Sequence, residues 1–354
     1  MDLEICKFAD IKLSDVFFDS LRSSYPEFDN WFKKKGDTGE TAYVFKDDKG
    51  NVIDFLYVKI EEGEVNDVNP VLPPKKRLKV GTFKLVSRHT RRGERFMKKI
   101  MDRAVSENVD EIYVTIFPTE PLQYLIDLFQ KYGFEHKSDK LHEGRDSEWV
   151  LVKDMRNHVS DILKDYPIVK IGGVEKHLLS IYPSYHTKLF PDSILTNESY
   201  DLVQDISPTN GIYKIYICWM RDVDKLNKGD LLVIYRTSDN LGPAQYRSVA
   251  TSVCTVEEIK TYKDFDTIDD FVRYTNRYSI FSPVELQKWY KYKNNFVVIK
   301  MLYNVAFSKR VIRKDLLEKV GISKEAYWGF CKITDQQFND IIKLGQANEC
   351  YFID

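Results

Sequence analysis

Residues 77–93 read RLKVGTFKLVSRHTRRG. Its first ten residues carry the apolar pattern of a pleated strand. After residue 93, apolar side chains recur at three- and four-residue spacing to about Asn108, which indicates an amphipathic helix. These positions are Phe96, Met97, Ile100, Met101, Ala104 and Val105. A strand is therefore expected to lead into a helix through a short basic turn.

A second strand and a second helix follow. Residues 111–117 read EIYVTIF, a β-strand pattern that Pro118 closes. Pro121 suits the first position of a helix, and the apolar spacing continues to about residue 132. The apolar face of this helix comprises Leu122, Leu125, Ile126, Leu128 and Phe129. The predicted order is thus strand, helix, strand, helix.

The basic turn suits an anion. The free N–H groups at a helix start and the positive end of the helix dipole point into such a turn. Gly93 would let a phosphate approach the backbone closely. Four arginines supply charge and paired donors: Arg88, Arg91, Arg92 and Arg95. The turn is therefore a candidate phosphate site.

The charge around this turn is uneven. Between residues 75 and 103, twelve lysines and arginines face only Glu94 and Asp102, although the whole chain has a formal charge of −1. A polyphosphate ligand would explain this local excess. The alternative is a solvated basic face, which is common at strand-to-helix turns.

The order of these elements resembles the GNAT N-acetyltransferase superfamily over about the first 155 residues. The family's pyrophosphate loop reads Gln/Arg-x-x-Gly-x-Gly/Ala, and this chain has Arg88-x-x-Arg91-x-Gly93, with arginine at the middle glycine. The family's second helix commonly ends in Tyr-x-x-x-Gly-Phe, and residues 129–134 here read FQKYGF. Phe129 therefore replaces the tyrosine that often protonates the departing CoA thiolate.

The resemblance implies acetyl-CoA as co-substrate and direct attack of an amine on the thioester. The implied pantetheine contacts are Phe83, Lys84, Leu85 and Val86. The implied pyrophosphate contacts are Arg88, Arg91, Arg92, Gly93, Glu94 and Arg95. The candidate base is Glu61 or its neighbour Glu62, acting through water, and Tyr132 and Tyr124 are the hydroxyls available to the thiolate.

Length and composition set limits on the protein class. A chain of 354 residues is long enough for two or three domains. Its acidic N-terminus lacks a signal-peptide pattern, and no apolar run approaches membrane-spanning length, so we expect a cytoplasmic protein without a membrane partner. The five cysteines and six histidines are scattered, without the paired spacing of a zinc or redox motif. We therefore expect no metal.

The N-terminal half is predicted to be an α+β domain spanning residues 1–157, with a mixed sheet flanked by helices. Strands are expected at residues 2–8, 41–46, 52–61 and 149–152, and a helical region is expected from about Ser14, as its N-cap, to Phe32. Proline residues at 70, 73 and 74 indicate a loop before the basic strand. Residues 158–176 are predicted to be a linker, with a short helix around 158–163.

The second half, residues 177–354, reads mainly as short strands separated by turns. Strands are expected at residues 178–181, 212–217, 231–235, 246–256 and 296–299. Helices are expected at residues 267–275, 283–290, 313–320 and 335–344. This pattern predicts a small β-barrel with added helices.

This half resembles the PUA-like superfamily, in particular its ASCH and EVE-type barrels. The resemblance rests on residues 179–190, which read LSIYPSYHTKLF, on 228–236, KGDLLVIYR, and on the long return strand after Tyr246. The ASCH pattern Gly-x-Lys-x-x-Glu/Thr-x-Arg is not intact, so no hydrolase activity is carried over. The family implies RNA or modified-base binding, with stacking and phosphate contacts from Tyr235, Arg236, Tyr246 and Arg247. The alternative is that these tyrosines only pack, as strand tyrosines commonly do.

The sequence thus predicts an acetyl-CoA-dependent N-acetyltransferase whose PUA-like domain presents an RNA or tRNA-linked amine. One alternative is a non-catalytic RNA or modified-base binding protein with a degenerate acetyltransferase domain. The other is a protein or small-amine acetyltransferase whose second half serves assembly.

Overall fold

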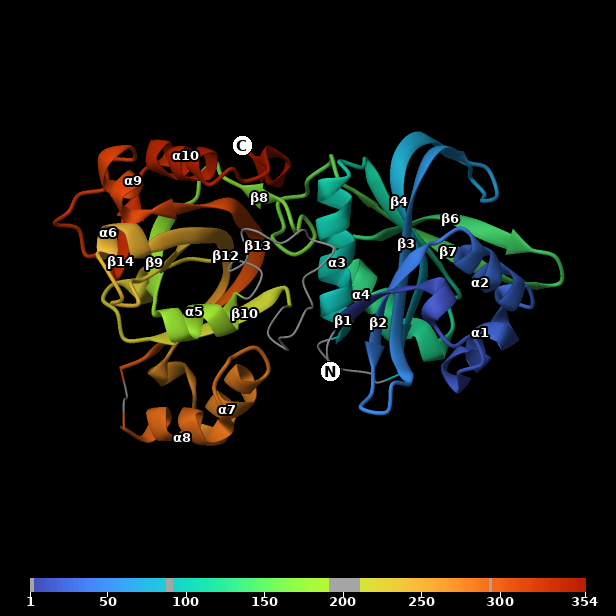
Figure 1. Ribbon diagram of the computed structural model, residues 1–354, viewed down its shortest axis with the longest axis horizontal. Coiled ribbons are helices and arrows are strands. Elements are labelled where there is room, and N and C mark those ends of the chain that lie inside the picture. The colour runs from blue at the N-terminus through green and yellow to red at the C-terminus, as the bar shows by residue number, and fades with distance from the viewer. Residues whose placement is uncertain (1–2, 87–91, 191–210, 293–294) are drawn as a thin grey trace. The chain divides into compact units, whose positions relative to one another are not determined.

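The computed structural model describes residues 3–86, 92–190, 211–292 and 295–354 (Figure 1). The described chain forms two compact units that divide between Tyr166 and Pro167. This division falls inside residues 158–176, the predicted linker. The short helix expected at 158–163 is instead an irregular segment that leads into a turn at residue 162. No described helix is long and apolar enough to cross a membrane.

The first unit is built on a seven-stranded mixed sheet with the strand order β1-β2-β3-β4-β5-β7-β6. Its strands are β1 (Leu3–Lys7), β2 (Thr41–Lys46), β3 (Val52–Val65), β4 (Leu72–Leu85), β5 (Glu111–Ile116), β6 (Glu135–His142) and β7 (Arg145–Asp154). Its helices are α1 (Asp19–Ser24), α2 (Phe28–Asp37), α3 (Arg92–Ser106) and α4 (Gln123–Lys131). The strand, helix, strand, helix order predicted from residue 77 onward is therefore present.

Helices cover both faces of this sheet, and the alternation of side chains along the strands decides which face each helix covers. On one face, Phe83 of β4 contacts Phe96 of α3 and Phe129 of α4, with ring centroids 5.5 and 5.4 Å apart. On the other face, Phe55 of β3 contacts Phe18, which lies just before α1, at 5.5 Å. Figure 1 shows α3 and α1 on opposite sides of β3 and β4.

Three local predictions for this unit differ from the structure. Asp15, not Ser14, accepts the capping hydrogen bond of the first helical turn, from the N–H of Phe17. The predicted continuous helix is interrupted, because α1 ends at Ser24 and α2 starts at Phe28. Pro73 and Pro74 lie inside β4 rather than in a loop, where they follow its first residue.

The second unit contains a six-stranded sheet with the order β10-β13-β12-β11-β9-β14. Its strands are β9 (Lys176–Ile181), β10 (Tyr213–Cys218), β11 (Leu231–Arg236), β12 (Val249–Thr261), β13 (Val297–Ile312) and β14 (Phe330–Ile333). Within the described ranges the outer strands β10 and β14 do not pair with each other. The predicted closed barrel is therefore wrong, and the sheet is open.

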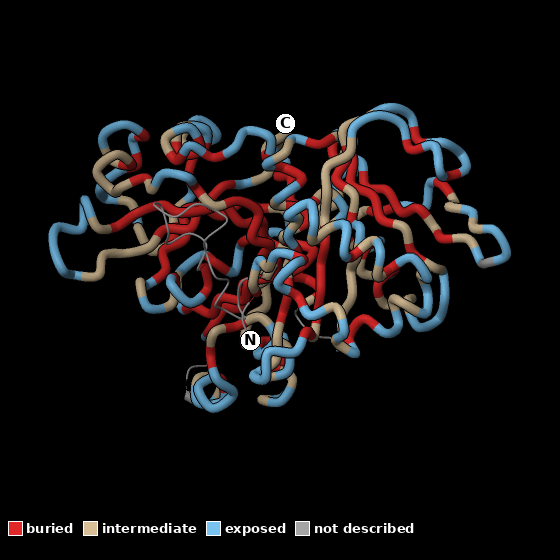
Figure 2. Tube along the Cα trace, turned by 45° about the vertical axis from the view of Figure 1, so that its right-hand side comes forward, coloured by how far each residue is buried: buried red, intermediate tan, exposed pale blue. Residues whose placement is uncertain are grey.

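Helices in the second unit are α5 (Pro183–Leu189), α6 (Ala244–Arg247), α7 (Ile268–Asn276), α8 (Pro283–Tyr292), α9 (Arg313–Glu318) and α10 (Asp335–Leu344). One apolar cluster joins α5 to strands β9–β13, and a second joins α7 and α8 to β10 and β13. Figure 2 shows that both sheets run through largely buried segments. A separate two-stranded sheet pairs β8 (Val169–Lys170) with β15 (Phe352–Ile353).

The strand predicted from Tyr246 is also wrong at its start. Residues 244–247 form α6, and β12 begins at Val249. Tyr246 and Arg247 are therefore on a short helix and do not alternate across a strand.

Candidate active site

The parallel strands β4 and β5 pair only at one end. Arg77 to Val80 pair with Glu111 to Val114, and no further pairing joins the two strands in the described chain. Beyond this point β4 continues beside β3, and β5 continues beside β7. We call the paired residues the closed end, and the segments from Gly81 and Thr115 onward the open end. The open end leaves one backbone edge of β4 without a partner strand among the described residues.

Gly81 stands where the two strands part. The register between β3 and β4 shifts here, so that Tyr57 pairs with Thr82 and Val58 pairs with Val80, which makes Gly81 a bulge residue. A Cβ at this position would lie 2.7 Å from Cδ1 of Tyr57. Only glycine therefore fits at the bulge without moving the buried Tyr57 ring.

A buried carboxylate links the last residue before the basic turn to the first residue of α3. Asp54 of β3 is fully buried, accepts a hydrogen bond from the N–H of Val86 at 3.0 Å and pairs with the guanidinium of Arg92. Burial raises the pKa of Asp54 to about 6, although the charge of Arg92 and the N–H of Val86 act in the opposite direction. Asp54 therefore holds in place the residues on both sides of the basic turn, Val86 and Arg92.

The predicted pyrophosphate contacts fall into two groups. Arg88 and Arg91 lie outside the described residues. The side chains of the described members interact within the protein. Arg92 pairs with Asp54, Glu94 lies 3.4 Å from Nζ of Lys131, and Arg95 covers the Phe45 ring at 4.7 Å.

Gly93 has a packing role that the sequence did not indicate. A Cβ on this glycine would lie 3.1 Å from Leu85 and 3.2 Å from Leu128. The glycine therefore lets the first turn of α3 approach both the end of β4 and helix α4.

The basic excess near the turn is partly met by acidic residues elsewhere in the fold. Of the ten cations of this set that the structure describes, at least seven pair with acids: Lys75 and Arg77 with Glu111, Lys76 and Arg103 with Glu107, Lys79 with Glu61, Arg92 with Asp54, and Lys98 with Asp102. Four of these five acids lie outside residues 75–103. The local excess therefore does not by itself require a polyphosphate ligand.

The predicted pantetheine strand, residues 83–86, belongs to the open end of β4. Phe83 faces α3 and α4, and Leu85 contacts the position of Gly93. Lys84 points to the opposite face, where its Nζ contacts Oγ of Ser20 at 2.6 Å. Val86 is exposed. Binding through this segment would therefore use its backbone edge, because two of its side chains are committed to the core.

The two candidate tyrosines lie at opposite ends of α4. Tyr132 is fully buried after the last turn, and its carbonyl accepts a hydrogen bond from Lys153 at 3.0 Å. Lys153 pairs with Ile112 in the sheet, so Tyr132 lies beside the closed end. Tyr124 is half-buried in the first turn, about 12 Å away along the helix axis. Tyr124 is thus nearer to the open end, where β5 ends.

Glu61 also lies at the closed end, opposite Arg77. It accepts a hydrogen bond from the hydroxyl of Tyr113 and pairs with Lys59 and Lys79. Burial opposes ionisation, but the hydrogen bonds from Lys59 and Tyr113 and the charge of Lys79 together lower the pKa of Glu61. These contacts make Glu61 a weaker base than an ordinary glutamate.

A polar cluster that the sequence did not reveal lies at the open end. Oε2 of the buried Glu148 in β7 accepts a hydrogen bond from the hydroxyl of Tyr25 at 3.1 Å, and its Oε1 lies 2.8 Å from Nε2 of His142. Phe117, the first residue after β5, contacts the rings of Tyr25 and His142 at 5.8 and 5.9 Å. The cluster therefore combines a carboxylate, an imidazole and a hydroxyl where β5 ends.

The sequence carried one weak signal for this cluster. His142 and Glu148 flank the hairpin turn at residues 143–144, and the hairpin register pairs Glu148 with Lys140, two residues from His142. Such diagonal neighbours on adjacent strands share one face of the sheet. Tyr25 lies in the segment between α1 and α2. Its contact with Glu148, which is more than a hundred residues away, could be seen only in the structure.

Of the four predicted RNA contacts, the two arginines lie close to one carboxylate, and only one of the two tyrosines is exposed. Arg247 pairs with Asp239 at 2.5 Å, and Arg236 lies 3.9 Å from the same carboxylate. Tyr246 is 50 % exposed, whereas Tyr235 is 1 % exposed and packs against Trp328. Tyr246 could stack on a base, but Tyr235 presents no free ring face.

No protein-family model matches the sequence, and no curated protein matches it. Solved structures similar to parts of the chain include both GNAT acetyltransferases and ASCH domain proteins. NAA60 from Arabidopsis thaliana, solved with acetyl-CoA, is 13 % identical at a TM-score of 0.31, covering 43 % of this chain and 99 % of that one. Naa20 from Chaetomium thermophilum, solved with a bisubstrate analogue, is 16 % identical at 0.30, covering 47 % and 88 %.

The ASCH protein from Zymomonas mobilis is 8 % identical at a TM-score of 0.34, covering 48 % of this chain and 94 % of that one. All three scores are below 0.5, so these similarities carry no argument about function.

Proposed function

We propose that residues 1–166 transfer an acetyl group from acetyl-CoA to an amine. The observation that carries this proposal is the separation of β4 from β5 after Val80. Among the described residues, it leaves an unpaired strand edge that runs from the bulge at Gly81 to the end of β4 at Leu85. An extended amide-containing arm such as pantetheine can add to such an edge as an extra strand would.

The two ends of acetyl-CoA fit the two ends of this edge. Its pyrophosphate would meet the first turn of α3, where free N–H groups favour an anion, together with the predicted contacts Arg88 and Arg91. Asp54 supports this position by holding Val86 and Arg92. The thioester would then lie near Gly81, between the two strands.

The Glu148 cluster supplies the groups that the transfer needs. With Nε2–H of His142 donating to Glu148, Nδ1 of His142 would carry the lone pair that takes a proton from the amine. The amine nitrogen attacks the thioester carbon, the C–S bond breaks, and CoA leaves as a thiolate that gains one proton. Tyr124, at the open end, is the better placed of the two candidate tyrosines to donate it. Holding the reactants together then replaces covalent catalysis.

For the acceptor, we propose an amine on RNA or on tRNA, held by the second unit. Among the described residues, all of the exposed large aromatic side chains lie in that unit: Tyr182, Trp219, Tyr246 and Tyr327. Exposed aromatic rings can stack on unpaired bases. The exposed large apolar residues of the first unit are all aliphatic.

Binding of acetyl-CoA tests the first part of the proposal. Calorimetry should show binding to the full chain, and Arg91→Glu should weaken it at least tenfold, because a carboxylate would then stand beside the pyrophosphate. Lys49→Glu, the same kind of charge reversal in an exposed turn, should have no effect. Gly93→Asp is a poorer probe, since its Cβ would press on Leu85 and Leu128. Equal affinity of the wild type and Arg91→Glu would refute the site.

The acceptor requires a separate experiment. The protein is incubated with radiolabelled acetyl-CoA and a cell lysate, and the labelled products are treated with ribonuclease or protease. Loss of the labelled macromolecule after ribonuclease supports RNA. Loss after protease alone supports the protein acetyltransferase alternative, and label only in small molecules supports a small-amine substrate. Acetyl-CoA binding without any transfer would support the non-catalytic alternative.

A further inference from the structure

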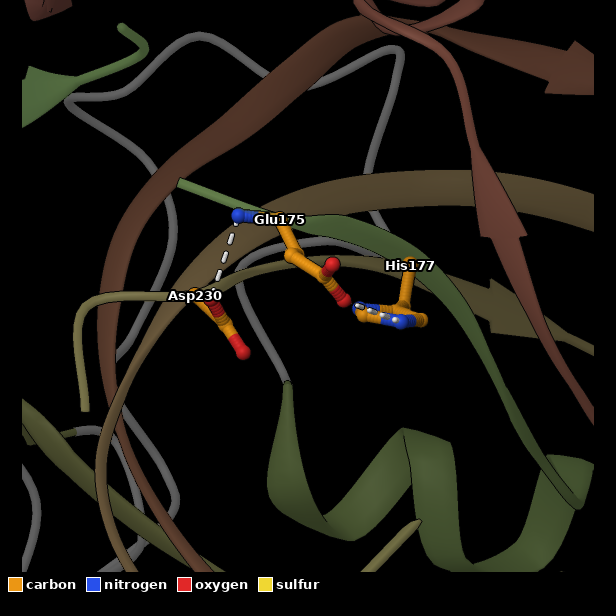
Figure 3. A group of neighbouring side chains, drawn as sticks. All are labelled: Glu175, His177 and Asp230. Carbon is orange, nitrogen blue, oxygen red and sulfur yellow. Dashed lines mark hydrogen bonds and ion pairs between the residues drawn. The ribbon is translucent and has the colours of Figure 1, made fainter. Parts of the chain in front are cut away.

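Three potential metal ligands meet where strands β9 and β11 begin. These are Glu175, His177 and Asp230, and one ligand atom from each lies within 4.8 Å of the others (Figure 3). The parallel register pairs Leu231 with Lys176, so Asp230 stands opposite Glu175. His177 is two residues beyond Glu175 along the strand, which places both on the same side.

Each of the three side chains is oriented by a contact with at least one residue outside the cluster. The carboxylate of Asp230 accepts hydrogen bonds from the N–H groups of Glu175 at 3.1 Å and Asn227 at 2.7 Å. Oε1 of Glu175 accepts a hydrogen bond from Nζ of Lys332, which leaves Oε2 directed toward His177. The ring of His177 stacks on Phe330, with centroids 4.7 Å apart. Supporting contacts of this kind orient the ligands of protein metal sites.

His177 is the member that packing does not explain. It is 7 % exposed, and its Nδ1 is buried without a hydrogen-bond partner among the described residues. Its Nε2 lies 3.7 Å from Oε2 of Glu175, beyond hydrogen-bonding distance. A buried polar atom without a partner destabilises the fold by about 1–3 kcal/mol. A core histidine held only by packing would normally have at least one ring nitrogen paired.

We propose that Glu175, His177 and Asp230 bind a divalent transition-metal ion, with zinc as the best match. One imidazole nitrogen and two carboxylate oxygens form a donor set that zinc accepts, whereas magnesium and calcium prefer oxygen alone. The two carboxylates balance the charge of a divalent ion. Three protein ligands leave a further coordination position for water.

The distances fit this ion after a small movement. Zinc holds its ligands at about 2.0–2.2 Å, which places tetrahedral ligand atoms about 3.4 Å apart. The present limit of 4.8 Å therefore requires a contraction of up to about 1.4 Å. The side chain of Glu175 is 50 % exposed, so it is free to move. Lys332 can retain Oε1 while Oε2 binds the ion.

The sequence did not indicate this site, because its histidines and cysteines are scattered and form no metal-binding motif. The ligands follow a Glu-x-His pattern on one strand, and the third precedes a different strand more than fifty residues later. All three ligands lie in the second unit.

Zinc titration of the metal-free full chain by calorimetry tests the proposal. The wild type should bind one zinc ion that His177→Ala loses and that Glu175→Gln weakens at least tenfold. His136→Ala is the matched control: that histidine lies 3.0 Å from Asp139 in the first unit, and its removal should leave this binding event unchanged. Magnesium at the same concentration should not compete.

Thermal unfolding gives a second readout that does not depend on folding of the His177 variant. Zinc should raise the melting temperature of the second unit in the wild type, because the ion binds only the folded state. It should not do so in Glu175→Gln, whose half-exposed side chain can change without disturbing the core. Equal zinc affinity of the wild type and Glu175→Gln, or loss of binding in His136→Ala alone, would overturn the site.

Discussion

Both ends of the β4–β5 strand pair hold a buried charged side chain, but the two side chains have different kinds of partner. At the closed end, Arg77 is 1 % exposed and donates to Glu111 at 2.7 Å and to the carbonyls of Gly63 and Pro73 at 3.0 and 2.6 Å. At the open end, Glu148 is just as buried, yet its partners are a tyrosine hydroxyl and a histidine ring. One end neutralises its charge with fixed partners, and the other holds groups that can gain or lose a proton.

This difference separates a stabilising role from the proposed chemical role within one pair of strands. Charges at the closed end are matched by cross-strand partners, so they hold the sheet together. Groups at the open end lie where β5 ends, beside Phe117. Changes at the closed end should therefore affect unfolding, whereas changes at the open end should affect the proposed reaction.

The largest expected effect is on stability at the closed end. Arg77→Ala removes the buried one of the two cations that pair with the buried Glu111 and leaves only Lys75, which should lower the free energy of unfolding of the first unit by about 3–5 kcal/mol. Urea denaturation measures this change. Arg156→Ala removes an exposed arginine 3.4 Å from Asp110 and should cost less than about 1 kcal/mol. Equal effects of the two variants would contradict the structural role of the closed end.

A smaller effect is expected in the pH dependence of stability, through Asp54. Its folded pKa, about 6, is above the ordinary value of 3.8, so the folded state binds the proton more tightly than the unfolded state. Stability should therefore fall as the pH rises from about 4 to about 6, by about 3 kcal/mol in total. Unfolding curves of the wild type and Asp54→Asn across this range measure it. A parallel pH profile in the two proteins would show that Asp54 does not titrate in this way.

The smallest of the three effects concerns the acetyl-transfer rate at the open end. His142→Ala removes the proposed base and should lower kcat about a hundredfold, equivalent to about 2.7 kcal/mol, with little change in acetyl-CoA affinity. His136→Ala, which removes a histidine stacked on Trp149, should react normally. A normal rate in His142→Ala would remove the cluster from the mechanism.

Much of the first unit was predictable because its patterns are local. The spacing of Phe96, Ile100 and Met101 predicts α3, and the β-strand pattern of residues 111–117 predicts β5. The point at which β4 and β5 separate could not be predicted, because it depends on pairing between segments some thirty residues apart. The same limit hid Glu111 and Asp54, the acids that neutralise Arg77 and Arg92. Charge counted along the sequence therefore overstated the basic surface.

In the second unit, the sequence predicted the positions of short strands better than it predicted how those strands pair in the sheet. Local patterns located β9, β11 and α10, but they do not report whether the outer strands of a sheet meet. Tyr246 illustrates a second limit. The residues that follow it are apolar enough for a strand, yet residues 244–247 turn into a helix after Gly242-Pro243. Its ring is exposed as a result, while Tyr235, on a true strand, is buried.

The small sheet of β8 and β15 has a consequence for the order of events during synthesis. β8 leaves the ribosome at the start of the second unit, but its partner β15 is made about 180 residues later. All strands of the first unit have by then been translated, so that unit can fold first, as domains commonly do. The six-stranded sheet of the second unit has all its strands once β14 is made, whereas the pair of β8 and β15 cannot form until translation reaches residues 352–353.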